Sequence, residues 1–148
     1  MSHGTIARHQ GELIQSPYDR LAPFYDALES LAERRFSPWR KRLWSEVEGP
    51  RVLEVGVGTG RNMPYYPEGL CITAIDISPQ MLKRARKRAA RLGLMLSLQQ
   101  ADVQALPFAD KSFESVVATL VFCSVADPVL GLREIRRVLV PGGQLLLI

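Results

Sequence analysis

The pattern of hydrophobic and polar positions divides the chain into two parts. From Arg51 to Ile148, continuously apolar runs alternate with segments of helical periodicity, and we expect strands over residues 51–57, 71–77, 94–102, 115–122 and 144–148. Strands that are apolar throughout, rather than at alternate positions, are typical of a parallel sheet covered by helices on both faces. Right-handed crossovers between them predict a doubly wound α/β sheet.

Residues at the ends of two helices support this alternation. Ser78-Pro79 supplies an N-cap and a first-turn proline, and the helix that it begins should end at Gly93. Asp127-Pro128 begins another helix, over residues 129–139. The proline and two glycines at 141–143 should then turn the chain into the fifth strand.

Residues 1–50 have a different pattern, with apolar side chains at helical spacing. We interpret them as a helical segment in front of the sheet domain of residues 51–148, and not as a separate domain. Two helices are indicated by Leu21, Phe24, Tyr25, Leu28, Leu31 and Ala32, and by Phe36, Trp39, Leu43 and Trp44.

Composition indicates one globular domain. The chain has 148 residues, of which 47% are hydrophobic and 23% charged, and it has no apolar run near the roughly 20 residues that span a bilayer. The N-terminus is too polar for a signal peptide, so we expect a cytoplasmic protein. Cys71 and Cys123, with only His3 and His9, give no zinc spacing, so we expect no metal and two buried free thiols.

The net charge of +4 is concentrated in two basic clusters. Either cluster could meet a nucleic acid or an anionic membrane, or could be a solvated helix face. The solvated face is favoured for the second cluster, because Met81, Leu82, Ala85, Ala89 and Leu92 form an apolar stripe on the same helix. The clusters are Arg34, Arg35, Arg40, Lys41 and Arg42, and Lys83, Arg84, Arg86, Lys87, Arg88 and Arg91.

A glycine-rich turn follows the first expected strand. Gly56, Gly58 and Gly60 would let the backbone bend sharply and approach a ligand beyond the carboxyl end of that strand. No Gly-Lys-Ser/Thr follows, which excludes a phosphate-binding P-loop. A dinucleotide fingerprint would have its third glycine where this chain has Arg61.

Two aspartates end the next two strands. Asp76 could accept hydrogen bonds from both ribose hydroxyls of a nicotinamide dinucleotide or of any adenosyl ligand. Asp102 could accept from an adenine amino group, with Val103 and Ile77 packing the ring. The alternative for each aspartate is a helix or turn cap, but their joint placement at successive strand ends favours a ligand site.

Glu54 lies within the first expected strand, between Leu53 and Val55. A buried carboxylate is unfavourable unless it has a partner. We therefore expect Glu54 to meet backbone donors of the glycine turn or a ligand cation.

From Arg51 to Ile148 the chain resembles class I S-adenosylmethionine-dependent methyltransferases, in the motifs VLEVGVGTGRN, AIDIS, ADVQALPFADKSFESVVATLVF and LREIRRVLVPGGQLLLI. This resemblance implies a Rossmann-like sheet of order 3-2-1-4-5 with S-adenosylmethionine as cofactor and S-adenosylhomocysteine as product. It implies that the methionine part is held by Glu54, Gly56, Gly58 and Gly60, the ribose by Asp76, the adenine by Ile77, Met81, Asp102 and Val103, and the sulfonium by Thr119, Leu120 and Val121.

The segment YDRLAPFYDALE resembles the N-terminal helix of bacterial phospholipid N-methyltransferases, and more loosely that of ubiquinone/menaquinone C-methyltransferases. The resemblance implies that residues 1–50 form a helical lid over the cofactor. Tyr18 and Tyr25 are then the candidate catalytic residues, because an aromatic face attracts a sulfonium cation. The alternative is that both tyrosines only pack the lid.

The chain stops on the fifth strand, whereas class I methyltransferases usually have seven strands. Because an apolar edge strand invites pairing, we expect either that the fold continues beyond this chain or that a homo-oligomer covers the edge. No residue is a convincing general base, which favours an amine, thiol or soft carbon acceptor.

The leading hypothesis is a methyltransferase acting on a small-molecule or lipid-like acceptor, of phospholipid-amine or quinone type. The basic clusters and the helix with Trp39 and Trp44 favour a peripheral membrane contact. A nucleic-acid methyltransferase is less favoured, because VFCSVADP follows the fourth strand in place of an Asn/Asp-Pro-Pro-aromatic motif. A non-catalytic adenosyl-binding module, a protein methyltransferase and, more distantly, a nicotinamide dehydrogenase are the remaining alternatives.

Overall fold

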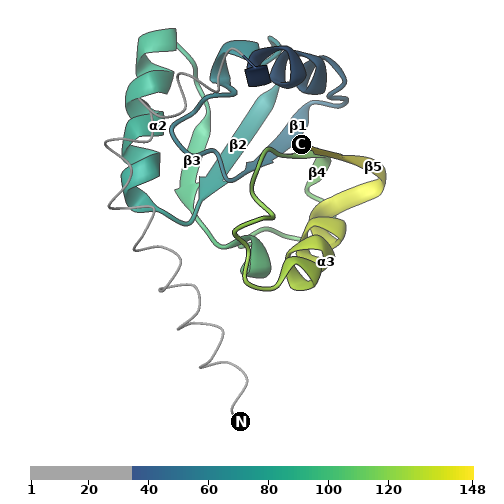
Figure 1. Ribbon diagram of the computed structural model, residues 1–148. Coiled ribbons are helices and arrows are strands. Elements are labelled where there is room, and N and C mark those ends of the chain that lie inside the picture. The colour runs from purple at the N-terminus through teal and green to yellow at the C-terminus, as the bar shows by residue number, and fades with distance from the viewer. Residues whose placement is uncertain (1–34) are drawn as a thin grey trace.

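The computed structural model describes residues 35–148, and the candidate lid tyrosines Tyr18 and Tyr25 lie outside that range. Its centre is a five-stranded sheet of order β3-β2-β1-β4-β5 (Figure 1), in which each neighbouring pair is parallel. The predicted doubly wound sheet and its strand order are therefore confirmed. The strands are β1 (Arg51–Val55), β2 (Cys71–Asp76), β3 (Ser97–Gln100), β4 (Phe113–Ala118) and β5 (Leu139–Leu147).

The two helices of the sheet domain begin at the predicted caps, and the first also ends where predicted, whereas the second ends one residue early because Leu139 belongs to the fifth strand. In α2 (Pro79–Leu92) the Ser78 hydroxyl accepts from the backbone N–H of Met81 at 3.2 Å, and Gly93 ends the helix at φ 66°. Asp127 caps α3 (Pro128–Val138) by accepting from the N–H of Leu130 at 3.0 Å. A further helix covers residues 35–45, and short 3₁₀ turns are η1 (Met63–Tyr65) and η2 (Val103–Ala105).

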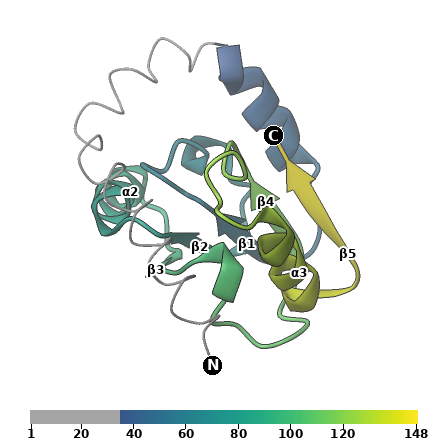
Figure 2. The same cartoon turned by 60° about the horizontal axis from the view of Figure 1, so that its bottom comes forward.

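Helices cover both faces of the sheet, and Figure 2 shows the sheet between α2 and α3. Successive side chains of β1 point to opposite faces of the sheet, because side chains alternate along a strand, and so they pack against different helices. Val52 packs with Leu43 and Trp44 of the helix 35–45, whereas Leu53 packs with Ile135 of α3 and their neighbours. No helix within residues 35–148 is both long and apolar enough to cross a membrane.

Three local predictions are wrong. The fifth strand starts at Leu139 and not after the glycines, because the chain pairs with β4 directly after α3 and the glycine segment forms an irregularity between Leu139 and Gln144. The other strands end earlier than expected, β4 at Ala118. Leu92 is 45% exposed, since it lies in the last turn of α2 beyond the edge of the core.

The two cysteines are free but exposed, which contradicts the prediction of buried thiols. Cys71 is the first residue of β2, and its side chain is exposed while that of the next residue, Ile72, is buried. Cys123 lies in the loop that follows β4. An apolar sequence neighbourhood therefore did not indicate burial at either cysteine.

Candidate functional site

A pocket opens beyond the carboxyl ends of β1, β2, β3 and β4, where a parallel sheet of this order binds ligands. Ten of the twelve residues predicted for the ligand site line it: Gly56, Gly58, Asp76, Ile77, Met81, Asp102, Val103, Thr119, Leu120 and Val121. Gly60 and Glu54 do not. The residues that line it without having been predicted include Arg40, Thr59, Arg61, Asn62, Gln104 and Ser124.

Two glycines of the glycine turn, Gly56 and Gly58, line the pocket. A Cβ on Gly56, which has a φ of 67°, would lie 2.3 Å from Cγ2 of Val121, so the turn packs directly on the segment after β4. Gly58 also has a positive φ, of 55°, but a Cβ there would meet nothing within 4 Å. Gly58 therefore faces open space in the pocket, which is the arrangement expected of a ligand cradle.

Asp76 is oriented by two backbone amides. Its Oδ2 accepts from the N–H of Gly58 at 2.8 Å, and its Oδ1 accepts from the N–H of Ser78 at 2.9 Å. The second bond is the turn cap considered as the alternative role. Because a carboxylate has about four acceptor sites, both oxygens can still accept from a ligand.

Asp102 likewise caps a turn while lining the pocket. It accepts from the N–H of Gln104 at 2.8 Å and from the side-chain amide of Gln104 at 3.1 Å. The same glutamine accepts from the N–H of Asp127 at 2.9 Å, at the start of α3. Gln104 therefore joins the pocket wall to the helix on that face.

Glu54 lies behind the pocket, at 1% exposure. Its Oε1 accepts from the amide of Asn62 at 2.6 Å, and its Oε2 accepts from the Tyr66 hydroxyl. Asn62 also donates to Thr119 at 3.1 Å and accepts from Arg40 at 2.7 Å. Of the two partners expected for Glu54, the backbone donors of the glycine turn are therefore wrong, and the side chains of Asn62 and Tyr66, in the segment directly after that turn, take their place. The ligand cation stays a prediction.

Burial dominates the ionisation of this network. It raises the pKa of Glu54 to about 7, although the hydrogen bonds from Tyr66 and Asn62 and the charge of Arg40 act in the opposite direction and Asp76 adds to the rise. The pKa of Tyr66 is raised well above its ordinary value, first by burial and then by the neighbouring Glu54. Tyr66 therefore stays a hydrogen-bond donor to Glu54 at any physiological pH.

Arg40 belongs to the pocket and not to a surface cluster. It is 6% exposed and lines the pocket, whereas its neighbours Lys41 and Arg42 are exposed. The sequence does contain a signal for this, because Arg40 precedes the buried Leu43 and Trp44 by three and four positions and so shares their helix face.

Thr59 is a further pocket residue that the sequence did not single out. It is 2% exposed, and its hydroxyl finds no hydrogen-bond partner among the residues that the structure describes. Buried hydroxyls without a partner are unfavourable, so this one is suited to a polar ligand. Within the same range, no group of three histidine, cysteine or acidic side chains is arranged to hold a metal ion.

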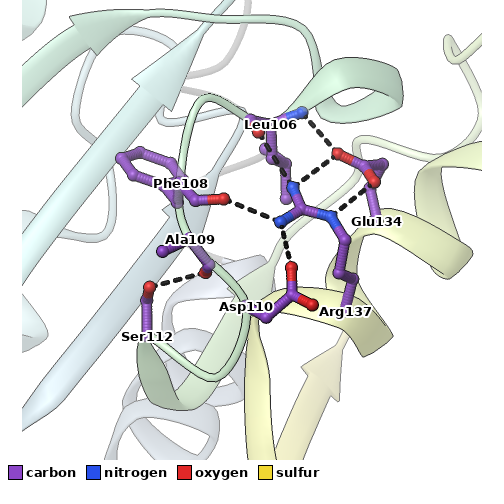
Figure 3. Close-up of polar contacts among 7 residues, drawn as sticks. All are labelled: Leu106, Phe108, Ala109, Asp110, Ser112, Glu134 and Arg137. Carbon is purple, nitrogen blue, oxygen red and sulfur yellow. Dashed lines mark hydrogen bonds and ion pairs between the residues drawn. The ribbon is translucent and has the colours of Figure 1, made fainter.

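Arg137 supports the segment that leads from the pocket back into the sheet (Figure 3). Its guanidinium donates to the carbonyls of Phe108 at 2.7 Å and Leu106 at 3.0 Å, and it pairs with Asp110 at 2.8 Å and Glu134 at 2.8 Å. These bonds fasten residues 106–110, which follow η2, to α3.

The chain is similar to proteins of one family. Residues 53–147 match the family described as a methyltransferase domain. The chain is 40% identical over 141 residues to a phosphatidylethanolamine N-methyltransferase of Cereibacter sphaeroides, with 93% of this chain and 68% of that protein covered. It is 32% identical over 145 residues to a ubiquinone/menaquinone biosynthesis C-methyltransferase of Geotalea uraniireducens (strain Rf4), with 91% and 62% covered.

A solved structure agrees with these relatives. An SAM-dependent methyltransferase from Thermotoga maritima superposes with a TM-score of 0.76 at 25% identity, over 90% of this chain and 60% of that one. The chain thus spans between 60% and 68% of the length of these three proteins.

Proposed function

Because the chain belongs to the methyltransferase domain family of S-adenosylmethionine-dependent enzymes, we propose that the protein transfers a methyl group to the amine of a phospholipid. The family and the cofactor predicted from the motifs are confirmed by this membership, and a nicotinamide dehydrogenase is set aside. The choice of acceptor is carried by the 40% identity to a phosphatidylethanolamine N-methyltransferase. A quinone-type carbon acceptor is the second candidate, supported by the relative that is 32% identical.

The pocket residues fit S-adenosylmethionine. Gly58 leaves room where a side chain would intrude, and the carboxylate of Asp76 is oriented to accept from a ribose. Asp102 is suited to the adenine edge, between Ile77 and Val103 in the pocket wall.

The methionine part of the cofactor has a carboxylate and an ammonium group. We assign Arg40 to the carboxylate, because it is a buried cation on the pocket wall. The orphaned hydroxyl of Thr59 and the amide of Asn62 complete that end of the pocket. In this assignment Glu54 acts through Asn62 and does not touch the cofactor.

S-adenosylmethionine supplies a methyl group that is already activated on a sulfonium. The residues of the chain therefore have to orient the reactants and exclude water. Glu54 cannot serve as a general base from its present place, because both of its oxygens are hydrogen bonded behind the pocket wall. An amine that arrives unprotonated needs no base from the protein and releases its proton to solvent.

The proposal is tested by labelled-methyl transfer to phosphatidylethanolamine, demethylmenaquinone and RNA, alongside calorimetric titration with S-adenosylmethionine and NAD. We expect methyl transfer to phosphatidylethanolamine, and we expect S-adenosylmethionine but not NAD to bind. Both the transfer and the binding should be lost in Asp76→Ala. Transfer only to the quinone or to RNA would replace the proposed acceptor. Binding of S-adenosylmethionine without any product would instead support a non-catalytic binding module.

A further inference from the structure

The helix of residues 35–45 has an inner and an outer side. Arg40, Leu43 and Trp44 are buried against the pocket and the sheet. Trp39, in contrast, is 58% exposed, although it is one of the largest apolar side chains. Arg35 and Arg42 lie one helical turn before and after Trp39 and are exposed too. We refer to Arg35, Trp39 and Arg42 as the outer stripe.

The charged side chains of the helix that carries the outer stripe are all basic. Residues 35–45 include Arg35, Arg40, Lys41 and Arg42 but no acidic residue. Glu46, one residue beyond this range, pairs with Arg42 at 3.1 Å, but both side chains are more than half exposed. An exposed ion pair of this kind contributes little, so Arg42 can exchange Glu46 for another anion.

We propose that the outer stripe docks on an anionic phospholipid surface, with the Trp39 indole at headgroup level and the two arginines against lipid phosphates. Tryptophan flanked by basic residues on a helix face is typical of interfacial binding, because its ring is apolar while its N–H remains hydrated. The adjacent Arg40 lines the cofactor pocket, so docking would bring a lipid surface beside the site. In this respect the inference rests on the proposed lipid acceptor.

A second exposed apolar surface competes with this one. On α3, Val129 is 57% exposed and Leu132 is 40% exposed, with Arg133 and Arg136 on the same exposed side. This surface has no aromatic residue, and its helix includes Glu134. Charge complementarity and the aromatic side chain therefore favour the outer stripe.

The tryptophan content provides a direct readout of docking. The chain has two tryptophans, and Trp44 is fully buried in the core. A change in emission on adding vesicles therefore reports on Trp39. With vesicles of phosphatidylcholine and phosphatidylglycerol, we expect a blue shift and quenching by brominated acyl chains. With phosphatidylcholine alone, or with Trp39→Phe, we expect neither.

Sedimentation with the same vesicles measures the contribution of each group. Trp39→Ala should weaken binding about tenfold. The double variant Arg35→Gln/Arg42→Gln should weaken it by about fivefold for each arginine. The matched control Lys83→Gln/Lys87→Gln, which removes two exposed charges from α2, should stay within about twofold of the wild type. All of these positions are exposed, so the variants should fold.

Other results would overturn the proposed docking surface or move it elsewhere on the protein. The absence of vesicle binding, or binding with unchanged Trp39 emission, would overturn the docking surface. Loss of binding in Val129→Ser/Leu132→Ser but not in Trp39→Ala would move the surface to α3. If Trp39 acts only in docking, transfer to a water-soluble short-chain phosphatidylethanolamine is unaffected by Trp39→Ala, and a loss of that transfer would overturn a docking role for Trp39. If vesicles bind but no acceptor is methylated, the proposed function fails while docking stands.

Discussion

Asn62 connects three segments through one side-chain amide. It donates to Glu54 and Thr119 and accepts from Arg40, so all the polar atoms of the amide have partners. Such a network fixes the side chains around it, because any rotation would leave a buried group unpaired. The pocket wall around Asn62 is therefore set by contacts that need no ligand.

The buried Glu54 predicts a pH-dependent stability. Its pKa is about 7 in the folded protein and near the ordinary 4.5 in the unfolded chain, so between these values only the folded protein holds the proton. Stability from this group is fully present below pH 4.5 and is lost as the pH rises to 7, by about 3 kcal/mol. Urea unfolding across this range should show the loss in the wild type relative to Glu54→Gln. Parallel curves for the two proteins would contradict a raised pKa.

Replacing Arg40 should weaken the binding of some ligands and not of others. Arg40→Gln should weaken binding of S-adenosylhomocysteine by about tenfold or more, since a charge-assisted hydrogen bond is removed. Binding of methylthioadenosine, which lacks the amino-acid part, should not change. Calorimetry with both ligands tests this, with the exposed neighbour Lys41→Gln as control. An equal loss for both ligands would make Arg40 a purely structural residue.

At the scale of elements, the glycine turn predicts that two glycine-to-alanine variants lose similar stability but differ in cofactor binding. Gly58 and Gly69 both have a positive φ, and a Cβ on either would meet nothing within 4 Å. Alanine should therefore destabilise both proteins similarly, by about 1–2 kcal/mol of backbone strain. Only Gly58 lines the pocket, so only Gly58→Ala should also lose cofactor affinity. Thermal unfolding and calorimetry of the pair measure the two effects, and unaltered affinity in Gly58→Ala would exclude it from the cradle.

The attachment of residues 106–110 to α3 depends on Arg137. Replacing it by alanine leaves the carbonyls of Leu106 and Phe108 without their side-chain donor, while the Glu134 carboxylate keeps only the N–H of Leu106, and should lower the free energy of unfolding by about 2 kcal/mol. The adjacent Arg136 is exposed, and Arg136→Ala should change stability by less than about 0.5 kcal/mol. Denaturant titration of both variants tests this, and a similar small effect for Arg137→Ala would mean that the segment is held by other contacts.

At the scale of the whole molecule, β5 forms one edge of the sheet that the structure describes, and Leu147 is 50% exposed there. The expectation of a homo-oligomer stays a prediction. We expect the 148-residue chain to self-associate through this strand, because its backbone groups on that side lack strand partners within residues 35–148. Leu147→Lys should shift sedimentation velocity toward the monomer. A monomeric wild type with well-protected β5 amides would contradict the prediction.

The sheet could be predicted because its causes are local. Apolar runs, the Ser78 and Asp127 caps and Gly93 act within a few residues, and they indicated every strand and helix of the sheet domain. The positions of the glycines and of the strand-end aspartates could be predicted equally well, since a parallel sheet brings the carboxyl ends of successive strands to one edge.

The polar network could not be predicted in this way. The bond of Asn62 to Arg40 joins residues 22 positions apart, and its bond to Thr119 spans 57. No periodicity records which polar side chains meet between elements. Glu54 could be recognised as buried and in need of partners, but the identity of those partners is a property of the folded chain.

The shared amide of Asn62 also has an evolutionary consequence. Glu54, Arg40 and Thr119 each rely on the same side chain, so a change at position 62 alters three polar environments in a single step. Substitutions at these four positions should therefore occur together during evolution. A substitution at one position should be accepted only where another of the four has already changed. Reconstructed ancestors of the chain would then differ at the four positions as a group, while the basic residues on the surface of α2 turn over one at a time.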